Sequence, residues 1–289
     1  MQIPGMMKES EEIIMKKFKI AALALTVALA IGVVTGCGKT AKESETQTTV
    51  KVGLTGTIYE EIWNPIVDKF QEEGVNIELV QFSDFSLPNQ ALHSGDIDLN
   101  AFQHHAYFNS DVESNGYNIT PIGDTIIMAM NLYSDKISDV SELKDGDTIG
   151  IPNDASNGGR ALKLLESAGI LTLNESAGSN PEISDIVSYN VNVELVETNA
   201  ADLCALLPDV TAAVINGNYA LDYGIDPNEE AIFNETEYYD DSYFCLIAAR
   251  SEDADNELYQ RIVKEFQSEQ TKEICKDTFK GFFVPAWEK

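Results

Sequence analysis

Positive charge is scarce in this chain of 289 residues, which has 19 Lys and Arg against 48 Asp and Glu and a formal net charge of −29. Such a chain repels the phosphate backbone of nucleic acids, so a nucleic-acid partner is not expected. The acidic residues are spread along the chain without long blocks, as on a solvated surface.

Histidine and cysteine are also rare, with three and four residues respectively. The chain has no C-x-x-C pair and no H-x-x-x-H or H-E-x-x-H spacing, so the usual signatures of zinc sites are missing. We expect Cys204, Cys245 and Cys275 to be small buried apolar residues. Neither a metal nor another cofactor is expected.

Signatures of common catalytic sites are absent too. The sequence contains no G-x-S-x-G elbow, no P-loop and no G-x-G-x-x-G after a strand, and no cysteine has a nearby basic partner that would activate it. Acidic pairs such as Asp96 and Asp98 are too common in this composition to indicate catalysis. The sequence therefore predicts a protein that is not an enzyme.

An apolar stretch near the N-terminus is too short to span a membrane. Residues 20–34 are fifteen uncharged residues, fewer than the ~20 that a bilayer-crossing helix needs. Three lysines precede them and small residues follow, which is the layout of a secretory signal peptide. Residues 1–14 carry three glutamates, whereas a signal peptide begins with positive charge. Met15 is therefore the expected start, and residues 1–36 are the predicted signal segment.

The end of this segment, "VTGC" (34–37), resembles the bacterial lipobox, in which signal peptidase cuts before a lipid-modified cysteine. The resemblance implies a lipid on Cys37 that holds the protein on the outer face of the cytoplasmic membrane. Residues 37–49 are polar and lack aromatics, which predicts a flexible tether.

Strand and helix patterns alternate after the tether. A β-branched run at 49–54 is followed by helical spacing at 59–74 and a strand pattern at 75–82. The same strand-then-helix order recurs at 148–169, 191–207 and 212–224. This alternation predicts an α/β fold with largely parallel sheets.

Two long apolar strands, 126–134 and 243–250, interrupt this order and enclose three of its repeats. We infer a second lobe inserted into the first, with the two strands as a hinge. The first lobe is predicted at 50–133 and 245–289, and the second at 134–244.

Two loops that follow strands carry polar residues suited to a ligand. In "IPNDASNGGRAL" (151–162) a strand leads into a helix start, which favours an anion, and Arg160 can grip a carboxylate with two hydrogen bonds. In "AAVINGNYAL" (212–221), Asn216 lies at the carboxyl end of a strand, where open α/β sheets bind ligands. A surface arginine beside a capped helix and a plain Asn-Gly turn are the alternatives.

Two of the three histidines are adjacent, in "LNAFQHHAYF" (99–108). Neighbouring side chains point to opposite faces of a strand and diverge by about 100° on a helix, so His104 and His105 are poorly placed to share a metal. A polar residue at a packed edge is the simpler interpretation of each.

Together, "VQFSDFSLPNQALHSGDIDLNAFQHHAYF" (80–108) and the two loop segments, in this order behind a lipobox, closely resemble the NlpA-type methionine-binding lipoproteins. These are the solute receptors of methionine ABC importers, and the resemblance covers essentially the whole mature chain. It implies a two-lobed α/β fold of the periplasmic-binding-protein kind (type II), with mixed sheets, flanking helices and a ligand cleft between the lobes.

The resemblance also implies partners and site residues. The partners are L-methionine or a related sulfur-containing amino acid, a membrane permease and its ATPase, and a monomer is expected. The implied pocket places Phe85, Phe102 and His104 around the ligand side chain, Asn157 and Arg160 at its polar end, Asn216 as a principal contact, and Tyr243 in the hinge return.

Some positions depart from the family pattern and leave the ligand open. Phe85 stands where a tyrosine is frequent, and "GLTGT" (53–57) lacks a proline found in many members. D-methionine, a methionine dipeptide or a related sulfur compound are alternatives. A zinc or manganese receptor using His93, His104 and acidic residues, and an extracellular hydrolase, are the rival functions.

Overall fold

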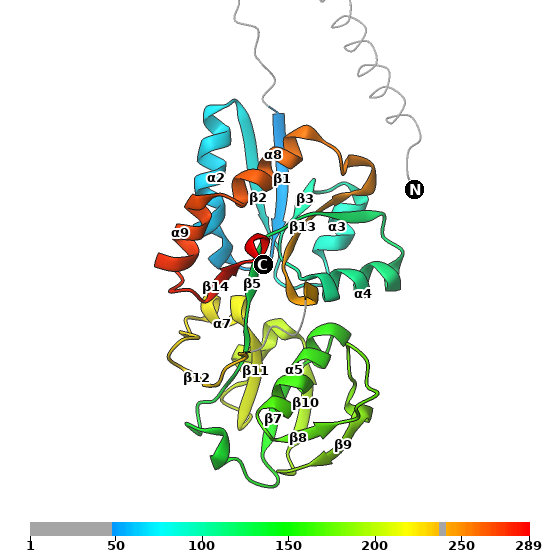
Figure 1. Ribbon diagram of the computed structural model, residues 1–289, viewed down its shortest axis with the longest axis vertical. Coiled ribbons are helices and arrows are strands. Elements are labelled where there is room, and N and C mark those ends of the chain that lie inside the picture. Colours follow the sequence, from blue (N-terminus) through cyan, green and yellow to red (C-terminus); the bar gives the residue numbers. More distant parts are fainter. Residues whose placement is uncertain (1–47, 237–240) are drawn as a thin grey trace, which may run out of the picture. The chain divides into compact units, whose positions relative to one another are not determined.

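Two five-stranded mixed sheets organise the chain (Figure 1). The computed structural model describes residues 48–236 and 241–289. The predicted signal segment 1–36, the predicted lipidation site Cys37 and nearly all of the predicted tether lie outside the described residues. The α/β class and the mixed sheets implied by the resemblance are present, with helices packed on the sheets. The largely parallel sheets expected from the strand–helix alternation are not, because both sheets also contain antiparallel pairs.

The first sheet has the strand order β2-β1-β3-β13-β4. Its strands are β1 (Thr48–Leu54), β2 (Val75–Gln81), β3 (Leu99–Asn100), β4 (Ile119–Asp124) and β13 (Leu246–Arg250). Strand β1 pairs in parallel with β2 and β3, whereas β13 runs antiparallel to β3 and β4.

Both faces of this sheet are covered, as the two core clusters that share β13 show. Ile247 and Ala249 belong to a core cluster shared with helices α2 (Glu60–Glu72) and α8 (Glu257–Phe266). Leu246 and Ala248 belong to another cluster, which includes residues of helices α3 (Pro88–Ser94) and α4 (His105–Asn115). Neighbouring side chains of a strand point to opposite faces, so the burial of all four residues from Leu246 to Ala249 requires cover on both sides.

The second sheet has the order β10-β7-β11-β6-β12. Its strands are β6 (Met130–Tyr133), β7 (Thr148–Pro152), β10 (Glu194–Thr198), β11 (Ala212–Asn216) and β12 (Ala231–Phe233). Strands β7, β10 and β11 are parallel, and β6 is antiparallel to β11 and β12. Helix α5 (Ala155–Ser167) packs on one face, and α6 (Leu203–Leu206) and α7 (Gly217–Tyr223) pack on the other.

The crossing between the two sheets differs from the sequence-based boundary. The apolar stretch 126–134 is two strands, because β5 (Ile126–Met128) pairs with β14 (Phe283–Pro285) and β6 pairs with β11. Met130 and Leu132 enter the core of the second sheet. The predicted boundary after Tyr133 is therefore too late, and the chain crosses at Ala129.

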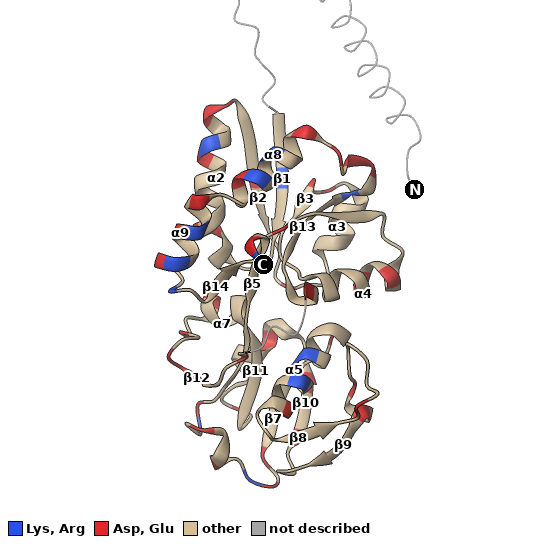
Figure 2. Cartoon of the chain, viewed as in Figure 1, with Lys and Arg blue, Asp and Glu red and all other residues tan. Residues whose placement is uncertain are grey.

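We call residues 48–129 and 245–289 the first lobe and residues 130–236 the second lobe. The last helices of the chain, α8 and α9 (Glu269–Asp277), return to the first lobe and contribute to its core. Strands β8 (Leu171–Leu173) and β9 (Ile186–Tyr189) form a small antiparallel pair in the second lobe. Acidic residues are scattered over the elements of both lobes (Figure 2).

Candidate functional site

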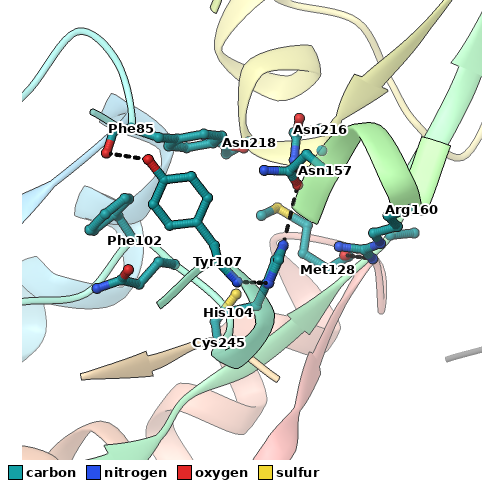
Figure 3. A pocket seen from close by; sticks show the side chains of 13 residues that line it. Phe85, Phe102, His104, Tyr107, Met128, Asn157, Arg160, Asn216, Asn218 and Cys245 are labelled. Atoms are coloured by element: carbon teal, nitrogen blue, oxygen red, sulfur yellow. Dashed lines mark hydrogen bonds between the residues drawn. The ribbon is translucent and has the colours of Figure 1, made fainter. Parts of the chain in front are cut away.

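Six of the seven predicted site residues line one cavity at the boundary between the lobes (Figure 3). The first lobe contributes Phe85, Phe102 and His104, and the second lobe contributes Asn157, Arg160 and Asn216. The space between atoms, including its opening to solvent, is about 370 Å³. Its lining combines aromatic rings with a few polar side chains, as in sites that bind small organic molecules.

Aromatic rings form one wall of the cavity. The centroid of Phe85 lies 5.8 Å from those of both Phe102 and Tyr107, and Tyr107 donates a hydrogen bond of 2.9 Å to the Phe85 carbonyl oxygen. Phe85 also packs against Tyr219 of the second lobe, with centroids 4.9 Å apart. This wall is apolar, and its rings are held by one another.

His104 is held in one tautomer by the start of helix α4. It is the N-cap of that helix, and its Nδ1 accepts a hydrogen bond of 3.1 Å from the Tyr107 backbone N–H. The ring proton therefore lies on Nε2, which is 3.2 Å from Asn157 Oδ1 and donates to it. Burial and the nearby positive charge of Arg160 lower the pKa of His104 to about 3, so the ring is neutral.

Two asparagines of the second lobe extend this hydrogen-bond chain. Asn157 Oδ1 also accepts from Asn216 Nδ2 at 2.9 Å, and Asn157 Nδ2 donates to the carboxylate of Asp154, the N-cap of α5. Asn216 Oδ1 is buried without a hydrogen-bond partner among the described residues. A buried acceptor of this kind is costly unless a ligand donates to it.

Arg160 lies on α5 and is almost completely buried, with a relative exposure of 3%. Its Nε and Nη2 donate to the two carboxylate oxygens of Glu235 at 2.7 and 2.5 Å, and Nη2 also donates to the Met128 carbonyl oxygen at 2.8 Å. Burial lowers the pKa of Arg160, but the charge and hydrogen bonds of Glu235 outweigh that effect and the net direction is upward. Arg160 therefore stays charged inside the protein.

Tyr243 is the seventh predicted residue, and it lies behind the cavity instead of lining it. Its ring centroid is 4.4 Å from the Arg160 guanidinium carbon and 5.3 Å from the His104 centroid, at right angles to that ring. A ring face over a guanidinium is an attractive cation–π arrangement. Tyr243 thus supports two residues of the cavity.

The family assignment comes from the sequence as a whole. A family model described as NlpA lipoprotein matches residues 50–287. The chain belongs to the NlpA lipoprotein family.

Individual NlpA relatives match over nearly their whole length. The chain is 36% identical to the D-methionine-binding lipoprotein MetQ of Escherichia coli (strain K12) over 276 residues, which cover 94% of this chain and 99% of that protein. It is also 36% identical to outer membrane lipoprotein 2 of Mannheimia haemolytica over 279 residues, covering 93% and 99% of the two chains.

Solved structures agree with this assignment. A nutrient binding protein from Burkholderia cenocepacia bound to methionine superposes with a TM-score of 0.77 at 39% identity, covering 82% of this chain and 99% of that one. The chain thus has the fold of the periplasmic substrate-binding proteins.

The three histidines of the chain lie in different surroundings. His105 Nε2 is 2.7 Å from Asp124 Oδ1, and His93 Nδ1 accepts from the Asn118 backbone N–H. Within residues 48–236 and 241–289, no group of three or more His, Cys, Asp or Glu is placed to hold a metal ion. Across the same ranges, no helix is both long and apolar enough to cross a bilayer.

Sequence reasoning missed several residues that line or support the cavity. Tyr107 could have been found, because it lies three residues after His104 on the helix that His104 caps. Met128 and Cys245 also line the cavity, but they lie at strand ends whose facing depends on the order of strands in the sheet. Glu235 follows β12 and contacts Arg160 from 75 positions away.

Proposed function

We propose that this protein is a non-catalytic, lipid-anchored receptor that binds L-methionine or a close analogue outside the cytoplasmic membrane and delivers it to an ABC importer. The observation that carries the proposal is that one cavity combines an aromatic wall of the first lobe with polar side chains, most of them from the second lobe.

The aromatic wall suits the side chain of methionine. A thioether sulfur gains about 0.3–1.5 kcal/mol from each aromatic ring at suitable distance. Phe85, Phe102 and Tyr107 offer three such rings around one space. In the proposed complex the methylthio group lies against these rings.

The polar residues suit the other end of an amino acid. The free Oδ1 of Asn216 is an acceptor for the ligand ammonium group, and Arg160 is a donor for the ligand carboxylate. Burying either charge without a partner would be costly. The ligand is thus proposed to contact both lobes, so its binding favours the conformation in which they are close together.

The relatives support the ligand class. One is described as D-methionine-binding and another was solved with methionine bound. We therefore propose L-methionine or a close analogue as the ligand of this chain. The proposed location is the outer face of the cytoplasmic membrane, with the protein a monomer held by a lipid on Cys37 and docking on a permease and its ATPase.

Calorimetric titration of the purified protein tests the proposal directly. L-methionine, D-methionine and L-norleucine, in which a methylene replaces the sulfur, are titrated separately. We expect methionine to bind at least about fivefold more tightly than norleucine, or about 1 kcal/mol. No heat with either methionine enantiomer would refute the ligand assignment.

Two further measurements test the location and the transport role. Replacing Cys37 by Ala should move the protein from the membrane fraction to the soluble extracellular or periplasmic fraction. Deleting its gene in the host should reduce uptake of labelled methionine at low concentration, and the intact gene should restore it. Unchanged uptake in a host without a second methionine importer would count against the transport role.

A further inference from the structure

The carboxylate of Glu235 occupies the edge of Arg160 that could otherwise bind a ligand carboxylate with two parallel hydrogen bonds. Glu235 Oε1 accepts from Nε and Oε2 accepts from Nη2, and both side chains are about 97–98% buried. Oε2 also accepts from the Met130 backbone N–H at 2.9 Å. The pair is therefore fully desolvated and rigidly held.

The contacts of this pair span the crossing between the lobes. Arg160 donates to the carbonyl of Met128, on one side of Ala129, and Glu235 accepts from the N–H of Met130 on the other side. The backbone N–H of Glu235 donates to Asn131 Oδ1 at 2.9 Å. These bonds fix Arg160 relative to the crossing, so the guanidinium has little freedom to rotate toward a ligand.

The remaining donors of Arg160 are the two N–H groups of Nη1. No hydrogen bond among the described residues uses Nη1, and Arg160 lines the cavity. A ligand carboxylate can therefore meet Arg160 at Nη1, while the edge formed by Nε and Nη2 stays with Glu235.

The charge of the cavity follows from this pairing. Arg160 and Glu235 cancel, and the neutral ring of His104 adds no charge. Cys245 also lines the cavity, and burial raises the pKa of its thiol to about 12, so it is uncharged as well. A buried cavity with no net charge favours a ligand whose own charges sum to zero.

We propose that Glu235 is a specificity-determining residue that restricts this cavity to zwitterionic amino acids by neutralising Arg160 and occupying the edge formed by its Nε and Nη2. The inference rests on the proposed function, since it concerns the ligand of the same site. Without Glu235, the positive charge of Arg160 would be uncompensated and the edge formed by its Nε and Nη2 would be open. Carboxylates without an ammonium group would then become ligands.

A comparison of two ligands tests this inference. L-methionine is a zwitterion, and 4-(methylthio)butanoate is the same molecule without its ammonium group. We expect Glu235→Gln to raise the affinity for the anion relative to L-methionine by at least about tenfold. The double variant Arg160→Gln with Glu235→Gln, which removes both charges, should return the ratio to near the wild-type value.

Glu229→Gln is the matched control, because it removes an acidic residue from the exposed loop between α7 and β12. It should leave the ratio of the two affinities unchanged. A ratio that stays within about twofold of wild type in folded Glu235→Gln protein overturns the inference. If wild-type protein binds neither ligand, the proposed function itself has failed, which is a different result.

A crystal structure of the unaltered protein with L-methionine gives a second test that does not depend on a variant folding. We expect Glu235 to remain on Nε and Nη2 of Arg160, with the ligand carboxylate at Nη1. A ligand carboxylate that displaces Glu235 from Arg160 overturns the inference even if methionine binds tightly.

Discussion

His104 of the first lobe donates a hydrogen bond to Asn157 of the second lobe across 3.2 Å. The same Asn157 oxygen also accepts from Asn216, so one amide oxygen joins the two halves of the cavity. Because the Nδ1 of His104 is already used by a backbone N–H, the ring can make this bond only as a donor through Nε2. The junction therefore depends on a neutral histidine and a correctly oriented amide.

Replacing Asn157 by Ala should weaken methionine binding at least about tenfold, or about 1.4 kcal/mol. The substitution removes the acceptor shared by His104 and Asn216 and leaves both donors buried. Titration calorimetry measures the change. Asn153→Ala in the exposed turn before α5 is the control and should bind methionine as wild type does.

Removing Arg160 should destabilise the fold as well as weaken binding. Arg160→Ala leaves Glu235 buried without its partner, and breaking a buried ion pair in this way costs about 3–5 kcal/mol. Lys69→Ala breaks the more exposed pair with Glu265 and should cost less than about 1 kcal/mol. Urea unfolding measures both, and similar losses would mean that Arg160 and Glu235 are not coupled.

The neutral state of His104 predicts how stability depends on pH. Its pKa is lowered to about 3 by burial and by Arg160, while in the unfolded chain it is near 6.5. Between these values the unfolded chain binds a proton that the folded chain does not, so stability contributed by this group is complete above pH 6.5 and is lost as the pH falls.

Going from pH 7 to pH 5 should therefore reduce the free energy of unfolding of wild type by about 2 kcal/mol more than that of His104→Gln. His105→Gln is the control, because His105 contacts Asp124 and does not line the cavity. It should retain most of the wild-type loss. Equal pH dependence in wild type and His104→Gln would contradict the depressed pKa.

Gly217 begins α7 where no larger residue fits. A Cβ at this position would lie 2.5 Å from the Phe282 ring and 2.8 Å from the Ala129 carbonyl oxygen at the crossing. We expect Gly217→Ala to reduce the free energy of unfolding by about 1–3 kcal/mol. Gly178→Ala, where a Cβ meets nothing within 4 Å, should change it by less than about 1 kcal/mol.

Much of the fold could be predicted because strands and helices leave local periodic patterns. The strand at 212–215 is present as β11, whereas the helix expected to start at Arg160 begins earlier, at Ala155, because Asp154 caps it there. The crossing could not be placed, since 126–130 is apolar throughout and nothing in it marks the change of sheet at Ala129. That change depends on pairing with β14 and β11, which are distant in sequence.

The residues of the site could likewise be predicted only where a local motif marks them. His104, Asn157 and Asn216 stand in recognisable motifs at element boundaries, and the fold brings them within hydrogen-bond distance. Glu235 stands in no motif, and only the folded chain brings it to Arg160. Residues that set the charge of a buried site through such distant contacts leave no local signal.

The thiol of Cys245 can be used to measure how often the two lobes open. It borders the cavity, whereas Cys275 is buried in the core of the first lobe. Cys204 lines another hollow shared by the two lobes. Once Cys37 and Cys204 are replaced, a thiol reagent should reach Cys245 when the lobes part and reach Cys275 only when the first lobe unfolds. The labelling rates of these two native thiols would thus time opening and unfolding separately in one experiment.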